Sequence, residues 1–291
     1  MTTRLSNAWR RNRFMNKATV KKAFCLLLVT GLLFVETDVF AQNAKLFLGI
    51  KLRAEVQALA DEIENKTKRK ISAHFVEYAG EEQFMLGSSF IHSDGVPYLA
   101  VSIDLKDQPK KAEAVIAHEL LHLRLRANGY PVFLFDPKVK TKRGRAQDVE
   151  QSNVNDLTSL IEHRAFKSEM ERFGLNEALN LAGETERGAL ARRGEADAQA
   201  DAINFARALL EYQNAADIEA LRKIYRDNKW QQSLKIGQEI ADIIKRTQLD
   251  SPAATASTFR LCAAKLYPTP RPIKLTADKT ITAYQQMLIG F

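Results

Sequence analysis

Residues 114–122 read AVIAHELLH and contain two of the five histidines of the chain. His118 and His122 are four residues apart, so on a helix both imidazoles project from one face, one turn apart. Two neutral imidazole nitrogens at this spacing can occupy two corners of a tetrahedral zinc site, with bonds of about 2.0–2.1 Å. Glu119 can accept a proton from a metal-bound water, whose pKa zinc lowers toward about 7. The stretch therefore predicts a metal-binding helix with a general base.

This spacing is the H-E-x-x-H motif, and the stretch resembles the metal-binding helix of the zincin metallopeptidases. The resemblance implies an α+β, zincin-like domain with an N-terminal helix, a small and mainly antiparallel sheet, the motif helix and a second ligand helix. It also implies hydrolysis of peptide bonds by a metal-activated water, with Glu119 as the general base. The expected cofactor is then Zn²⁺, and the expected partner is a peptide or protein substrate.

Zinc needs a third protein ligand, and the best source is the segment 153–166. It follows the second histidine at a distance that allows a loop and a returning helix, and its apolar residues recur at helical spacing. Resemblance to the gluzincins, which use two histidines and a glutamate, favours Glu162 as that ligand. His163 is the alternative, which gives a site of three histidines. Asn155 and Asp156 are candidates for orienting a ligand, with helix capping as their other role.

The N-terminal 41 residues have the pattern of a secretory signal peptide. The first 22 residues contain seven basic residues and no acidic one, and an apolar run follows at 23–35. Val39 and Ala41 are small residues at the −3 and −1 positions of a cleavage site. We therefore expect a periplasmic or secreted protein, or alternatively one that an uncleaved segment tethers to a membrane. After cleavage no stable span is expected, because the run is shorter than the roughly 20 residues that a bilayer requires.

The positive charge of the chain belongs largely to this N-terminal segment. The chain has 43 basic and 35 acidic residues, and the first 41 residues hold seven and two of them, so the remainder carries about +3. That small excess gives no reason to expect nucleic acid as a partner. Only Cys262 remains after cleavage, so the exported chain has no internal disulfide and depends on its core for stability. The sequence leaves the oligomeric state open.

The hydrophobic pattern predicts three regions and their main elements. Residues 1–41 are the signal peptide, 42–175 the zincin-like domain, and 176–291 a mostly helical C-terminal region. Before the motif we expect an amphipathic helix at 46–63 and then strands at 71–78, 83–92 and 98–105. The last strand either borders the cleft and pairs with an extended substrate or is an ordinary central strand.

The ends of the motif helix are also marked in the sequence. Asp107 is the expected N-cap, and Pro109 lies early in the first turn. Asn128 and Gly129 supply the expected left-handed stop.

Two other classes of function remain open at the level of sequence. The chain can be an exported, non-catalytic zinc-binding or interaction domain. It can also be a zinc amidase that acts on a cell-wall cross-link, because the same metal chemistry serves any amide. Metal analysis together with the peptide-cleaving activity of a Glu119→Gln variant separates catalysis from binding alone, and a comparison of protein with murein substrates separates the two hydrolases.

Overall fold

The computed structural model describes residues 46–78, 86–135, 144–174, 198–212, 214–267, 273–280 and 283–289. The predicted signal peptide and the predicted boundary after residue 175 lie outside these ranges. The chain separates into two compact units, Met1–Leu52 and Arg53–Phe291.

The first unit contains an antiparallel hairpin of β1 (Leu46–Phe47) and β2 (Ile50–Lys51). Between its strands, Leu48 and Gly49 have φ values of 55° and 78°, the left-handed conformation of a tight hairpin turn. The helix predicted from residue 46 begins only at Ala54. That part of the prediction was wrong because the chain reverses direction at Leu48 and Gly49, whose left-handed φ values are incompatible with a continuous right-handed helix.

A three-stranded sheet follows in the second unit. The strands β3 (Ser72–Val76), β5 (Pro97–Ser102) and β4 (Gly87–Ile91) lie in the order β3-β5-β4. β3 is parallel and β4 antiparallel to β5, so the sheet is mixed rather than mainly antiparallel. Of the two roles predicted for β5, the structure gives it the central one. Within the described ranges β4 pairs with β5 alone, which makes β4 an edge strand.

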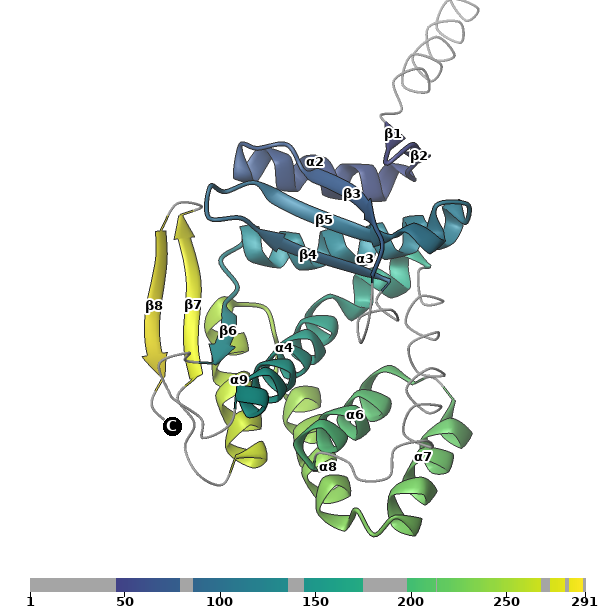
Figure 1. The fold of residues 1–291 in the computed structure, drawn as a ribbon, viewed down its shortest axis with the longest axis vertical. Coiled ribbons are helices and arrows are strands. Elements are labelled where there is room, and N and C mark those ends of the chain that lie inside the picture. The colour runs from purple at the N-terminus through teal and green to yellow at the C-terminus, as the bar shows by residue number, and fades with distance from the viewer. Residues whose placement is uncertain are drawn as a thin grey trace, which may run out of the picture. The chain divides into compact units, whose positions relative to one another are not determined.

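The helices α2 (Ala54–Thr67) and α3 (Pro109–Ala127) pack together alongside this sheet (Figure 1). A short 3₁₀ helix, η2 (Ile103–Leu105), precedes α3. The N-cap of α3 is Gln108 and Pro109 is its first residue, so the prediction of Asp107 as the cap was wrong. The predicted end at Asn128 is confirmed. Gly129 there has a φ of 77°, as the left-handed stop requires.

The chain returns through β6 (Val132–Phe135) into α4 (Gly144–Phe173), which contains the predicted helical segment 153–166. α4 packs on α3 and on two of the later helices, which are α6 (Ala198–Glu211), α7 (Ala215–Asp227), α8 (Gln231–Arg246) and α9 (Pro252–Leu266). The described part of the chain is thus α+β, as predicted, and most of its residues lie in helices. Within it, no helix is long and apolar enough to cross a membrane.

Two strands at the C-terminal end were not predicted. β7 (Ile273–Thr280) and β8 (Ala283–Ile289) form an antiparallel sheet with β6 in the order β6-β7-β8 (Figure 1). The pairing joins segments about 140 residues apart in the chain, from Val132 to Thr276. Local periodicity does not report such a pairing.

The core of the C-terminal half lies among α4, α6, α8 and α9. Phe133 of β6 stacks on Phe259 of α9, with ring centroids 3.7 Å apart. Cys262, one turn further along α9, is fully buried in the same core. Burial raises the pKa of its thiol to about 12.

We therefore expect the Cys262 thiol to be unreactive while the protein is folded. The thiolate is the reactive form, and burial both excludes reagents and keeps the thiol protonated. In a Cys25→Ser variant at about pH 8, a disulfide reagent such as DTNB should titrate one thiol in urea and almost none under native conditions. Rapid titration of the native protein would contradict this placement of α9.

Candidate metal centre

Three of the five histidines of the chain converge where α3 and α4 meet. His118 and His122 lie on α3, and His163 lies on α4. One ligand nitrogen from each ring lies within 4.8 Å of the other two. The Nε2 atoms of His118 and His122 are 3.2 Å apart. Two ligands of a tetrahedral ion with bonds of about 2.0–2.1 Å stand roughly 3.3–3.4 Å apart, so this pair already has a suitable spacing.

The buried ring of Phe166 lies against all three imidazoles. Its centroid is 5.6 Å from that of His118, 5.0 Å from that of His122 and 5.6 Å from that of His163. An apolar ring in this position excludes water from one side of the cluster and restricts rotation of the imidazoles. The three imidazoles therefore pack on the same apolar side chain.

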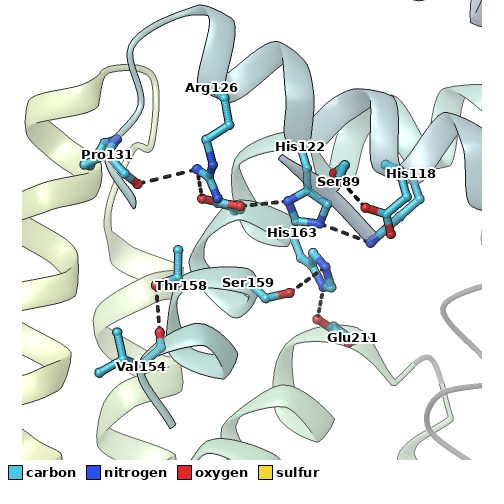
Figure 2. Close-up of polar contacts among 12 residues, drawn as sticks. Ser89, His118, His122, Arg126, Pro131, Val154, Thr158, Ser159, His163 and Glu211 are labelled. Atoms are coloured by element: carbon cyan, nitrogen blue, oxygen red, sulfur yellow. Dashed lines mark hydrogen bonds and ion pairs between the residues drawn. The ribbon is translucent and has the colours of Figure 1, made fainter. Parts of the chain in front are cut away.

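Glu162 forms a hydrogen bond with His122 on the side of the ring that faces away from the cluster. One carboxylate oxygen is 2.7 Å from His122 Nδ1, and the other is paired with Arg126, which also donates to the Pro131 carbonyl (Figure 2). Burial alone raises the pKa of Glu162, but Arg126 and His122 outweigh it and lower the pKa to about 2. The ionised carboxylate can only accept a hydrogen bond, so Nδ1 of His122 is the donor. Its Nε2 is then directed to the cluster.

His163 has an equivalent partner from a distant part of the chain. Its Nδ1 is 2.7 Å from the carboxylate of Glu211 at the end of α6, and Arg207 of the same helix is 4.0 Å from that carboxylate. Burial alone raises the pKa of Glu211, but His163 and Arg207 lower it overall. The carboxylate therefore accepts the Nδ1 proton. The other nitrogen of His163, Nε2, is 3.0 Å from the Ser159 hydroxyl (Figure 2).

His118 differs from the other two imidazoles. Its Nδ1 is buried, and the described part of the chain provides no hydrogen-bond partner for it. Burial, followed by the neighbouring His163 and His122, lowers the pKa of His118 well below its usual value. The ring is therefore neutral near pH 7, which is the form that binds a metal.

Glu119 is buried beside the imidazoles and is held by β4. The Ser89 hydroxyl donates to its carboxylate at 2.7 Å. Gly87 of the same strand leaves the necessary space, because a β-carbon there would lie 3.0 Å from Glu119 Cγ and 2.6 Å from Val115. Burial raises the pKa of Glu119, although His122 and the Ser89 hydrogen bond oppose the shift. A raised pKa suits a group that accepts a proton near neutral pH.

The structure thus brings His118, His122 and Glu119 together, as their spacing predicts. It places His163, the alternative third ligand, among the ligand nitrogens. Glu162, the preferred ligand at the level of sequence, contacts the Nδ1 side of His122 instead, and both of its oxygens are engaged. This geometry favours a centre of three histidines.

The two residues predicted to orient a ligand lie further out. Asn155 is exposed, and its side chain accepts a hydrogen bond from Gln151 at 2.7 Å. Asp156 lies 3.6 Å from Arg207, which in turn approaches Glu211. Asp156 is therefore connected to the cluster only through two other side chains.

Sequence reasoning missed Ser89, Ser159, Arg126 and Glu211. Arg126 had a usable signal, because it is four residues after His122 on the same face of α3 and can meet a carboxylate there. Ser89 and Ser159 belong to no motif. Glu211 lies 48 residues beyond His163, and only the packing of α6 against α4 brings it to the site.

No protein-family model, curated protein or solved structure matches this chain. Three close imidazoles, of which two are backed by ionised carboxylates, can hold a metal ion. The spacing alone does not select the metal.

Proposed function

We propose that the protein is a zinc-dependent hydrolase that cleaves peptide bonds. His118, His122 and His163 bind the zinc, and Glu119 is the general base. One observation carries the proposal, namely a buried carboxylate of raised pKa beside three imidazoles that can share an ion. Catalytic zinc sites have this form, with three protein ligands and a fourth position left for water.

The donor set supports zinc among the divalent metals. Imidazole ligands suit zinc, copper, iron and nickel, and a three-histidine tetrahedron with an adjacent base is a common zinc arrangement. When bound, zinc supplies a Lewis acid and lowers the pKa of a water ligand to about 7. His118 is neutral, and Glu162 and Glu211 hold the Nδ1 atoms of His122 and His163, so Nε2 is the nitrogen through which those two rings can bind the ion.

The residues around the ion have separate tasks. Glu119 takes the proton of the attacking water and passes it to the leaving amine. Ser89 fixes the orientation of that carboxylate through its hydroxyl. Glu162 and Glu211 keep the imidazoles of His122 and His163 in the tautomer that binds metal.

The edge strand β4 supports an extended polypeptide as the substrate. β4 pairs only with β5 within the described ranges, so its other edge offers backbone groups to an added strand. Because Ser89 of β4 contacts Glu119, a peptide on this edge would lie close to the general base.

Metal content tests the ligand set. The wild-type chain should bind one zinc, and His163→Ala should lose stoichiometric zinc because a protein ligand is gone. Glu162→Gln should keep zinc, with an affinity lowered about 10- to 100-fold, because it removes an orienting partner. Elemental analysis and competition with a chromogenic chelator measure both effects. If His163→Ala retains zinc and Glu162→Gln loses it, Glu162 is the third ligand and His163 is not.

A substrate panel tests the reaction. Zinc-loaded protein is assayed with unfolded casein and with purified murein fragments. Cleavage of casein supports the peptidase, and cleavage of murein alone identifies a cell-wall amidase. Zinc binding without either activity identifies a non-catalytic domain.

A further inference from the structure

Ser159 already occupies the lone pair of His163 that a metal would need. It lies one helical turn before His163 on α4, with its Oγ 3.0 Å from His163 Nε2 (Figure 2). The other nitrogen, Nδ1, is 2.7 Å from the Glu211 carboxylate, which can only accept, so Nδ1 is the donor of that hydrogen bond. In the singly protonated ring, which is the form that binds a metal, the Ser159 hydroxyl is then the donor and Nε2 the acceptor.

A metal can reach His163 only at the nitrogen that Ser159 holds. Binding through Nδ1 would break the hydrogen bond to Glu211, which is charge-assisted and the stronger of the two. Metal-binding imidazoles ordinarily keep such a carboxylate on the opposite nitrogen. His163 therefore binds through Nε2, after the Ser159 hydroxyl has turned away.

We propose that Ser159 is a latch on the metal-free centre, whose hydroxyl holds His163 through Nε2 and competes with the metal for that nitrogen. The inference rests on the proposed metal site, with His163 as the third ligand. No hydroxyl holds the other two ligands in the same way, because the Nε2 atoms of His118 and His122 form a hydrogen bond with each other at 3.2 Å.

The released hydroxyl has another acceptor close by on the same helix. Thr158, the preceding residue, donates to the carbonyl of Val154 four residues earlier at 2.7 Å (Figure 2). Serine and threonine make this bond readily within helices, and the corresponding carbonyl for Ser159 belongs to Asn155. A rotation about one side-chain bond exchanges the acceptors. The latch therefore opens without movement of α4.

The latch predicts that loss of the hydroxyl tightens metal binding. In Ser159→Ala, His163 Nε2 loses a hydrogen bond in the metal-free state only, so that state is destabilised relative to the bound one. The loss of one such bond corresponds to roughly a 2- to 10-fold gain in affinity. If Ser159 instead held His163 in the orientation that binds metal, its replacement by alanine would weaken zinc binding.

The test measures the zinc dissociation constant of the full chain by competition with a chromogenic chelator. Ser159→Ala should bind zinc more tightly than wild type, and Ser159→Thr, which keeps the hydroxyl, should bind like wild type. Thr158→Val is the matched control, because it removes a neighbouring hydroxyl that contacts a carbonyl and no imidazole. The visible absorption of the cobalt form should be the same in all four proteins, as expected for one coordination geometry.

The two possible failures are distinguishable. If wild type binds zinc and Ser159→Ala binds it equally or more weakly, the latch is wrong and the metal site stands. If Thr158→Val tightens binding as much as Ser159→Ala, the effect belongs to the helix and the latch is also wrong. If wild type and all variants bind no zinc, the proposed metal site itself fails.

Discussion

Glu119→Gln is expected to lower the rate of hydrolysis by about 10²- to 10⁴-fold while zinc stays bound. The amide has nearly the shape of the carboxylate but cannot accept a proton from water. Glu119 is not one of the three residues proposed to bind the metal, so its replacement leaves the ligand set intact. The measurement is kcat/KM on the substrate that the panel identifies, together with the zinc content of each protein.

Ser89→Ala provides the graded control for this variant. It keeps the carboxylate but removes the hydroxyl that holds it at 2.7 Å, so we expect a smaller loss of kcat with zinc retained. If Glu119→Gln keeps the wild-type rate with zinc bound, Glu119 is not the general base.

Glu162→Ala is expected to destabilise the metal-free protein by about 3–5 kcal/mol. The Glu162 side chain is only 1% exposed and pairs with both Arg126 and His122. Its removal leaves a largely buried guanidinium without its counter-ion and an imidazole N–H without its acceptor. Urea denaturation in the presence of a chelator measures the free energy of unfolding.

A second pair between the same two helices supplies the control. Arg124 of α3 and Glu169 of α4 also form an ion pair, but their side chains are 19% and 25% exposed. Glu169→Ala should therefore cost at most about 1 kcal/mol, as ion pairs open to solvent do. Equal losses in the two variants would show that burial does not set the strength of the Glu162 pair.

The helix that carries the site was predictable because its signal is local. The four-residue spacing of His118 and His122 fixes their common face whatever the rest of the chain does. The stop at Asn128 is equally local, since the chain needs a left-handed residue there and Gly129 provides it. Side chains one turn apart on one helix thus need no tertiary information.

The third ligand was harder to choose because Glu162 and His163 are adjacent. Neighbouring residues on a helix point about 100° apart, so the choice depends on how α4 is rotated about its axis against α3. That rotation is fixed by packing, including the contact of Phe166 with the imidazoles. Glu211 depends on packing still more, because it comes from a separate helix.

Two errors in the predicted secondary structure have different causes. β7 and β8 were missed because the strand they extend, β6, lies in another part of the chain. The hairpin at residues 46–51 was misread although Gly49, a residue that favours turns, interrupts its apolar run. In that case the sequence contained a turn signal, and the helical pattern of the residues after it was extended too far toward the N-terminus.

The centre draws its parts from three helices, since α3 and α4 supply the imidazoles and α6 supplies Glu211. An ion held there binds the folded chain and has no comparable site on the unfolded one. Free metal at about 100 times its dissociation constant would then add about 2.7 kcal/mol to the free energy of unfolding. The amount of folded protein, and not its activity alone, would thus follow the supply of metal.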